Sequence, residues 1–256
     1  MWNGKKVSIV LSTFNEKDSI RKCIDGFFAT GYVDEVIVVD NNAIEGTVEE
    51  VLKTKALLIC ETRQGYGYGY QFGLSKVAGD LIIMCEPDGT FCPSDVVKFL
   101  AYTGSDNVDA EKSMHVVLGS RTNATMILAG ANMGMFLKYG NYFVAKMIEL
   151  LFIKTAPHLS DCGCTYRLIT RNAYELMKPH FKEGGSAFGL EMTLLALRLG
   201  LPMCEIPVNY LERVGKSSVT GSFSGAFILG IKMIIMSWRH FIKERMEPIF
   251  LGKNKW

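Results

Sequence analysis

The sequence predicts an α/β protein built on a mostly parallel, Rossmann-like sheet flanked by helices. Short apolar runs alternate with helical segments through the first half of the chain. Of the 256 residues, 48% are hydrophobic and 21% are charged, a composition that supports a packed core and excludes a disordered chain. The formal net charge of +2 argues against a general nucleic-acid binder, because such proteins carry a basic excess.

The first half of the chain repeats a strand–helix unit. Apolar runs predict strands at residues 6–11, 35–39, 56–60, 80–85 and 116–119. Apolar side chains at helical spacing predict helices at residues 16–30, 47–54, 70–78 and 94–103. Repeated units with nearly continuous apolar strands are typical of a parallel sheet that is covered on both faces. Such sheets bind ligands beyond the carboxyl ends of their strands, so that edge is where the site is expected.

The second half of the chain is more apolar and divides less regularly. We expect a long helix at 126–152, a polar glycine-containing segment at 161–171, a helix at 188–199 and a strand at 203–210. Residues 221–238 are the most lipid-like stretch, but Lys232 lies in their middle. A charge at mid-bilayer is costly, so we expect a helix at the membrane surface or packed in the protein rather than a span. The prediction is a main domain at 1–220 and a C-terminal amphipathic helical region at 221–256.

Polar side chains, several of them acidic, follow three of the predicted strands. These segments are Ser12-Thr13-Phe14-Asn15-Glu16, Asp40-Asn41-Asn42 and Glu86-Pro87-Asp88-Gly89-Thr90. They converge on one edge if the sheet is parallel. Glu86 and Asp88 point the same way, and Mg²⁺ usually binds through one or two carboxylates together with substrate phosphates. Asp40 is placed to accept hydrogen bonds from a base or ribose. The sequence therefore predicts a site for a divalent cation and a diphosphate.

Taken in order, these motifs and Gly65-Tyr66-Gly67 resemble the GT-A glycosyltransferases of inverting family 2. Later motifs narrow the resemblance to dolichyl-phosphate mannose synthases and other polyprenyl-phosphate glycosyltransferases; they are Gly119-Ser120-Arg121, Lys138-Tyr139-Gly140-Asn141, residues 161–167 and Arg213-x-Gly215-Lys216-Ser217. The resemblance covers residues 5–220. It implies a GT-A fold and transfer of a sugar, with inversion, from a GDP-mannose or UDP-glucose type of donor to a polyprenyl or dolichyl phosphate.

The resemblance also implies roles for particular residues. Nucleotide contacts would come from Ser12, Thr13, Asn15, Glu16, Asp40, Gly67 and Glu86. Mg²⁺ or Mn²⁺ would be held by Glu86, Asp88 and Thr90, and the acceptor phosphate by Arg121, Lys138 and Arg213. The catalytic group would be Asp88, Arg121, Arg213 and Lys216. The sequence departs from the family pattern in having Glu86 where an Asp is usual, and in having Thr90 near the place of a frequent Gln.

A lipid-phosphate acceptor suits these residue types. An alcohol acceptor needs a general base, whereas a phosphate is already ionised near neutral pH. Arginines bind phosphate through paired, charge-assisted hydrogen bonds, and a metal stabilises the leaving diphosphate. The expected partners are a nucleotide-sugar, an isoprenoid lipid phosphate and a membrane surface, with the enzyme peripheral on the cytoplasmic face.

Three other functions fit parts of the sequence. A family 2 transferase acting on a glycan or other non-lipid acceptor would need a base, for which Asp161 and Glu191 are the candidates. A non-catalytic nucleotide-sugar-binding subunit is favoured only by Glu86. A dinucleotide-dependent oxidoreductase is suggested by Gly67-x-Gly69-x-x-x-Gly73, although this pattern does not follow the first strand as the fingerprint normally does.

Overall fold

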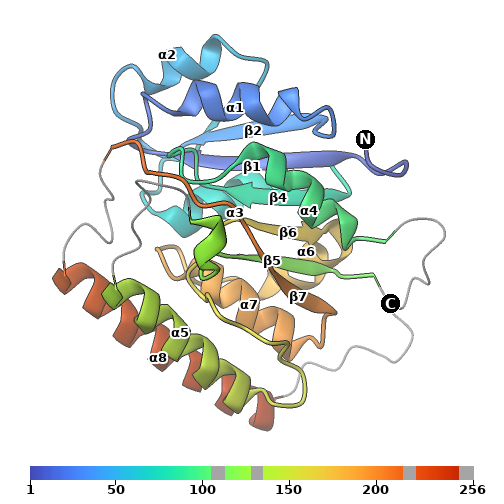
Figure 1. Ribbon diagram of the computed structural model, residues 1–256, viewed down its shortest axis with the longest axis vertical. Coiled ribbons are helices and arrows are strands. Elements are labelled where there is room, and N and C mark those ends of the chain that lie inside the picture. Colours follow the sequence, from blue (N-terminus) through green and yellow to red (C-terminus); the bar gives the residue numbers. More distant parts are fainter. Residues whose placement is uncertain (105–112, 128–134, 216–222, 248–256) are drawn as a thin grey trace.

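The computed structural model describes residues 1–104, 113–127, 135–215 and 223–247. A seven-stranded sheet with the order β3-β2-β1-β4-β6-β5-β7 runs through these residues (Figure 1). The strands are β1 (Val7–Thr13), β2 (Glu35–Asp40), β3 (Leu57–Cys60), β4 (Leu81–Cys85), β5 (Val116–Ser120), β6 (Arg167–Thr170) and β7 (Met203–Pro207). Strands β3, β2, β1 and β4 pair in parallel, as the repeated strand–helix units predict.

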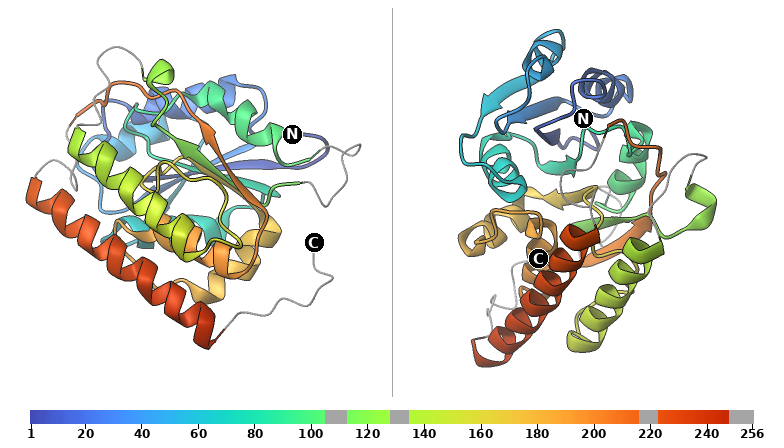
Figure 2. Two further views of the ribbon diagram at one scale, coloured as in Figure 1. Left: turned by 60° about the horizontal axis from the view of Figure 1, so that its bottom comes forward. Right: turned by 90° about the vertical axis from the view of Figure 1, so that its left-hand side faces the viewer.

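Helices cover both faces of the sheet and complete two hydrophobic cores (Figures 1 and 2). One core contains Ile24 and Phe27 of α1 together with Phe99 of α4. The other contains Tyr70 of α3 and Leu194 of α7. The helices are α1 (Ile20–Ala29), α2 (Thr47–Leu52), α3 (Tyr66–Lys76), α4 (Val96–Ala101), α5 (Met135–Leu151), α6 (Arg171–Met177), α7 (Phe188–Arg198) and α8 (Phe223–Met246).

One strand was missed by the sequence analysis. Strand β6 lies within the segment 161–171 that was interpreted as polar and irregular, and it pairs antiparallel with both β4 and β5. It has only four residues, which is too short for a clear period in the sequence. Because β4, β5 and β7 still run in one direction, their carboxyl ends share an edge of the sheet.

The glycines of α3 are explained by close packing. A Cβ atom at Gly73 would lie 2.5 Å from Cγ1 of Val10, and one at Gly69 would lie 2.3 Å from Oγ of Ser12. A Cβ atom at Gly67 would lie 2.3 Å from the carbonyl oxygen of Glu183. The helix also begins at Tyr66, four residues earlier than expected. The glycine pattern therefore lets a helix approach the sheet and a neighbouring loop, and it does not require a dinucleotide.

Helices α5 and α8 lie side by side at one end of the molecule (Figure 2). Helix α8 also packs on α7, and its Met233 is buried in the core. Apolar side chains nevertheless stay exposed along both helices, and we refer to them as the apolar stripes: Tyr139, Tyr142, Phe143 and Leu150 on α5, and Phe227, Ile228, Ile231, Ile235, Trp238 and Ile242 on α8. Among the described helices, α8 alone is long and apolar enough to cross a membrane by length and composition.

Candidate active site

The three polar strand ends do meet at one edge of the sheet. Strand β1 lies between β2 and β4, and the register places Thr13 beside Asp40 and Leu11 beside Cys85. The loops that follow β1, β2 and β4 therefore leave the sheet next to one another. This convergence was predicted from the sequence and is confirmed.

The loop after β4 holds Asp88 in a fixed orientation. Asp88 is 1% exposed, and its Oδ1 accepts hydrogen bonds from the backbone N–H of Thr90 at 2.9 Å and from the Thr90 hydroxyl at 2.6 Å. Gly89 has a φ of +82°, a conformation that glycine adopts without a steric cost and that turns the chain back between the two residues. Thr90 thus donates to Asp88, and this contact fixes one carboxylate oxygen.

The side chain of Arg213 lies against both carboxylates of this loop. Its Nη2 donates a hydrogen bond to Oε2 of Glu86 at 3.2 Å and forms an ion pair with Oδ2 of Asp88. Two backbone hydrogen bonds hold the segment that carries it, from Leu211 N–H to Thr90 at 2.8 Å and from Val214 N–H to Asp88 at 2.9 Å. The structure therefore brings Arg213 to two carboxylates from which the sequence separates it widely.

The carboxylate pair has the properties of a cation site. Burial, and then the neighbouring charge of Asp88, raise the pKa of Glu86, although Arg213 opposes the shift. Oδ2 of Asp88 is buried and takes part in no hydrogen bond of good geometry, although the ion pair with Arg213 reaches it. Two crowded carboxylates with an unsatisfied oxygen would gain from a divalent cation, so the residues present fit Mg²⁺ or Mn²⁺. In the described part of the chain, no group of three or more His, Cys, Asp or Glu side chains could hold a metal by itself.

Arg121 is committed to a partner that the sequence analysis did not assign to it. Its Nε and Nη2 donate to the two carboxylate oxygens of Asp161 at 2.8 and 2.9 Å, and its backbone N–H donates to Oδ2 at 3.0 Å. Burial alone would raise the pKa of Asp161, but the charge and hydrogen bonds of Arg121 keep it below its ordinary value. The Arg121 guanidinium also lies 5.5 Å from the centre of the Tyr210 ring.

The loops after β1 and β2 form a polar shelf beside the carboxylates. Oε2 of Glu16 accepts hydrogen bonds from the Thr13 hydroxyl and from the backbone N–H groups of Phe14 and Asn15. Asp40 is half-buried, and its Oδ1 accepts from the Ala43 N–H at 2.7 Å. Glu16 thus shapes the loop that presents Asn15, directly after Ser12 and Thr13 at the end of β1.

Asn41 follows the same edge and has a structural role. Its Nδ2 donates to the carbonyl oxygens of Glu61 and Arg63, and its Oδ1 accepts from the Gly65 N–H at 2.9 Å. These bonds tie the end of β2 to the start of α3. Asn41 thereby fixes the approach of α3 to the shelf.

The remaining predicted site residues are Lys138, Lys216 and Gly67. Lys138 lies on α5 and is half-buried; none of the ion pairs between described residues joins it to the carboxylate loop. Lys216 lies outside the described residues. Gly67 is buried against the loop at Glu183 and Gly184, so its close approach is to protein backbone.

The two carboxylates that the sequence offered as a general base, Asp161 and Glu191, are both engaged in contacts within the protein. Asp161 is held by Arg121, and its Oδ1 also accepts from the Gly163 N–H. Glu191 is 3% exposed, and its carboxylate accepts hydrogen bonds from the backbone N–H groups of Lys182 and Glu183. These carboxylates organise loops and are not presented to an acceptor.

Sequence reasoning missed Tyr210 and the anchoring of the segment that follows it. Tyr210 N–H donates to Met126, and Asn209 is held by the buried Asp95 through bonds of 2.6 and 2.8 Å. The one available signal was the polar run after the β7 strand, where Asn209 and Tyr210 precede Arg213.

The arrangement is that of a GT-A glycosyltransferase: a mostly parallel sheet has a carboxylate loop at its carboxyl edge, with a polar shelf beside the loop and arginines facing it. The chain belongs to glycosyl transferase family 2, whose model matches residues 8–176. The enzyme class and the fold expected from the sequence are thus confirmed.

Curated relatives of known activity match most of the chain. Dolichyl-phosphate beta-glucosyltransferase of Mus musculus is 27% identical over 242 residues, covering 86% of this chain and 72% of the relative. Undecaprenyl-phosphate mannosyltransferase of Micrococcus luteus is 24% identical over 240 residues, covering 88% and 92%. Low-salt glycan biosynthesis hexosyltransferase Agl6 of Haloferax volcanii is 28% identical over 217 residues, covering 83% of this chain, which spans only 49% of that relative.

Solved structures share the fold at low sequence identity. Glucosyl-3-phosphoglycerate synthase of Mycobacterium tuberculosis, crystallised with Mn²⁺, UDP and glucosyl-3-phosphoglycerate, has a TM-score of 0.71 and 15% identity, covering 93% of this chain and 80% of that one. The same enzyme crystallised with Mg²⁺ and UDP has a TM-score of 0.69 and 14% identity, covering 93% and 79%. These likenesses concern the fold.

Proposed function

We propose that this glycosyltransferase moves a hexose from a nucleotide-sugar of the UDP-glucose or GDP-mannose type to a polyprenyl phosphate, with inversion at the anomeric carbon. The observation that carries the proposal is the contact of Arg213 with Glu86 and Asp88, which joins a phosphate-binding cation to a metal-binding carboxylate pair. The relatives that act on dolichyl and undecaprenyl phosphates support the acceptor class.

The donor would bind across the polar shelf and the carboxylate loop. Asp40, Ser12 and Asn15 would contact the nucleoside, with Glu16 holding their loop in shape. Glu86 and Asp88 would hold the divalent cation, which when bound neutralises the diphosphate and stabilises it as a leaving group. Because the Thr90 hydroxyl already donates to Asp88, we assign Thr90 to positioning Asp88 rather than to ligating the metal.

The acceptor phosphate would bind on the arginine side of the site. Arg213 has donors to spare beyond the one atom that contacts the carboxylates, and it would bind phosphate once a cation takes that place. Arg121 binds Asp161 through Nε and Nη2, which leaves its other terminal nitrogen to donate to the same phosphate. Lys138 and Lys216 remain candidate phosphate contacts because they belong to the motifs that resemble polyprenyl-phosphate glycosyltransferases.

The protein contributes to this reaction mainly by placing the donor and the acceptor phosphate next to each other. An oxygen of the acceptor phosphate forms the new bond to the anomeric carbon, while the bond to the donor diphosphate breaks and its electron pair leaves with the diphosphate. An α-linked donor then gives a β-linked product. The nucleophile is already ionised, so no base is required. The engagement of Asp161 and Glu191 in structural contacts agrees with a reaction that lacks one.

The lipid would arrive along α5 and α8. The apolar stripes expose aromatic and aliphatic side chains on two neighbouring helices, and patches of this kind mark membrane or protein contacts. We propose that these helices lie at the cytoplasmic face of a membrane with the stripes in the interface, that residues 1–220 form the catalytic domain and that residues 221–256 form an interfacial region.

Transfer of radiolabelled sugar into the lipid phase tests the proposal. The protein is incubated with Mn²⁺, polyprenyl phosphate and each of a panel of labelled nucleotide-sugars, and the lipid is extracted. We expect label in the lipid phase with at least one donor. Label only on a water-soluble glycan would favour the transferase for non-lipid acceptors. Nucleotide binding without any turnover would favour a non-catalytic subunit.

A further inference from the structure

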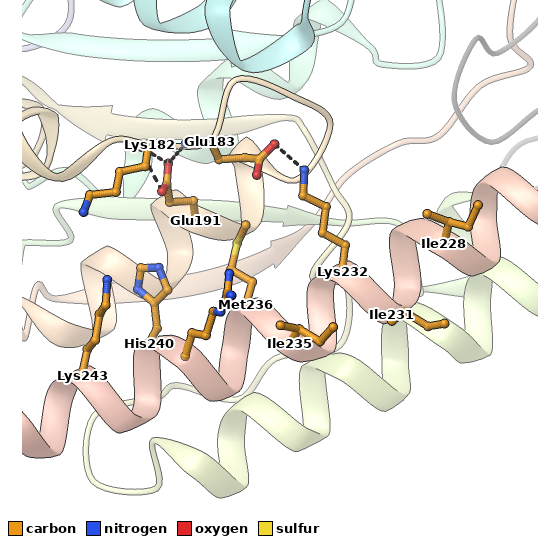
Figure 3. Close-up of a pocket in the computed structure, with 11 residues that line it drawn as sticks. Lys182, Glu183, Glu191, Ile228, Ile231, Lys232, Ile235, Met236, His240 and Lys243 are labelled. Atoms are coloured by element: carbon orange, nitrogen blue, oxygen red, sulfur yellow. Dashed lines mark hydrogen bonds and ion pairs between the residues drawn. The ribbon is translucent and has the colours of Figure 1, made fainter.

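A groove beside α8 is lined by residues outside the carboxylate loop. Its volume is 520 Å³, and its lining residues come from the segment before α7, from α7 and from one side of α8. Figure 3 shows the Lys232–Glu183 ion pair at one end and Lys182, His240 and Lys243 at the other. Ile235 and Met236 lie along the groove between the two ends.

The two ends of the groove differ in charge. At the Lys232 end, the ammonium group is neutralised by Glu183 at 2.7 Å. At the other end, none of the ion pairs between described residues gives a carboxylate to Lys182, Arg239 or Lys243. The remaining carboxylate of the lining, Glu191, accepts hydrogen bonds from two backbone N–H groups. Among the lining residues at this end, three cations, Lys182, Arg239 and Lys243, therefore face one carboxylate, Glu191.

The cations near this end of the groove also affect the pKa of His240. Burial, and then the charges of Arg198, Lys243 and Lys182, lower the pKa of His240 to about 4. The imidazole is thus neutral at physiological pH. Of the cations around it, Arg198 is paired with Glu244, whereas Lys182 and Lys243 take part in none of the ion pairs between described residues. An anion held there would relieve their mutual repulsion.

The groove also runs next to an apolar surface. Ile228, Ile231 and Ile235 line the groove and belong to the apolar stripe of α8, with exposed fractions of 65%, 44% and 49%. Ile235 lies eight residues before Lys243 on α8, about 12 Å along the helix, so a hydrocarbon chain attached to an anion at the basic end would reach this apolar surface. A basic end joined to an apolar surface suits an amphiphile with an anionic head and an apolar tail. A small inorganic anion would contact the basic end alone.

We propose that the basic end of this groove binds the phosphate head of an anionic phospholipid of the bilayer, with its acyl chains against the apolar stripe of α8. The inference rests on the proposed location of the enzyme at a membrane. It concerns a bilayer lipid and not the acceptor, because the lining of the groove includes no residue of the carboxylate loop and neither Arg121 nor Arg213, and the end near Lys232 is already neutralised.

Vesicle flotation of the full chain tests this site without any transfer reaction. Vesicles are made of phosphatidylcholine alone or with phosphatidylglycerol added. The double variant Lys182→Ala/Lys243→Ala is compared with the charge-matched double variant Lys22→Ala/Lys55→Ala. Its exposed lysines belong to α1 and to the link between α2 and β3, and α1 and α2 lie at the opposite end of the molecule from α8 (Figure 1). Thermal melting checks that both variants fold.

The wild type should bind the phosphatidylglycerol vesicles more tightly than those of phosphatidylcholine. The groove variant should lose about 30-fold in partitioning on the anionic vesicles, and the control should change by less than about threefold. Equal losses in both variants, or none in the groove variant, would overturn the site. Displacement of the protein from anionic vesicles by millimolar glycerol phosphate, at constant ionic strength, would reassign it to a soluble phosphate. Since flotation needs no donor or acceptor, these results stand apart from success or failure of the transfer assay.

Discussion

Arg213 reaches across 127 positions of the sequence to place its Nη2 3.2 Å from Oε2 of Glu86, and the same nitrogen contacts Asp88. The guanidinium therefore compensates the charge of the carboxylate pair from the position where a divalent cation would act. A residue that serves the carboxylates in one state and a substrate phosphate in another would couple metal binding to formation of the phosphate site.

Replacing Arg213 by alanine should separate these two roles. Without the competing cation, Mn²⁺ should bind the nucleotide-free protein about tenfold or more tightly, since an opposite charge at this distance shifts carboxylate equilibria by such factors. Sugar transfer should nevertheless fall. Electron paramagnetic resonance of free Mn²⁺ measures the first effect. The control is Arg63→Ala, which removes an exposed arginine from its ion pair with the buried Glu61. Unchanged or weaker Mn²⁺ binding would contradict the proposed competition.

Asp88→Asn should abolish most of the activity with little loss of structure. The amide keeps the volume and can still accept from Thr90, but it removes the negative charge that would hold the metal. We expect transfer to fall by about 100-fold or more. The matched control is Asp25→Asn, an exposed carboxylate on α1. Full activity of Asp88→Asn in the labelled-sugar assay would refute the metal assignment.

The Arg121–Asp161 pair should be a major contributor to stability. Asp161→Asn leaves a nearly buried guanidinium without its charge partner and should lower the free energy of unfolding by about 3 kcal/mol. The double variant Arg121→Met/Asp161→Asn should lose less than the two single losses combined, because no lone charge remains buried. Urea unfolding measures all three variants. Strict additivity of the losses would mean that the two groups do not interact.

His240 should make the folded protein sensitive to mild acid. Its folded pKa of about 4 lies below its ordinary value of 6.5, so the unfolded chain binds more protons between these values. The contribution of His240 is complete above pH 6.5 and is lost as the pH falls towards 4. With allowance for partial exposure, the loss between pH 7 and pH 5 should be about 1 kcal/mol.

Urea unfolding of wild type and His240→Asn at pH 7 and pH 5, without lipid, measures this contribution. The variant should lose less stability than the wild type over that interval. An equal loss in both proteins would place the acid sensitivity elsewhere in the chain.

Two helical glycines should respond oppositely to alanine. At Gly73 the added methyl group would meet Val10 and Val39 at 2.5 and 2.8 Å, so Gly73→Ala should destabilise the protein by about 1–3 kcal/mol. At Gly140 no atom lies within 4 Å, so the gain in helix propensity should stabilise by up to about 1 kcal/mol. Thermal melting compares them. Destabilisation by both substitutions would contradict the expected gain in helix propensity at Gly140.

Local pattern was sufficient to predict the β1, β2 and β4 ends and their shared edge. Apolar runs identify strands, and a parallel arrangement then brings Thr13, Asp40 and the Glu86–Asp88 loop together without further information. The short antiparallel strand β6 escaped because four residues carry no period, and the start of α3 was misplaced because its glycines are chosen for packing against Val10 and Glu183.

The sequence did not indicate which charged side chains pair with each other. Arg121 and Asp161 were both noted as functional candidates, yet nothing in their spacing of 40 residues indicates that they bind each other. The same holds for Arg213, whose place on the carboxylates depends on backbone bonds to Thr90 and Asp88. Such pairs follow from the folded path of the chain, which periodicity does not encode.

The choice of nucleophile tests the account most directly. The protein is incubated with its donor, Mn²⁺ and an equimolar mixture of polyprenyl phosphate and the matching polyprenol, and the lipid extract is analysed by mass spectrometry. The account predicts one hexose added to polyprenyl phosphate, none added to polyprenol, and loss of the product with Asp88→Asn. Hexose on polyprenol at a comparable rate, or only on a soluble glycan, would contradict the claim that an ionised lipid phosphate attacks without a base.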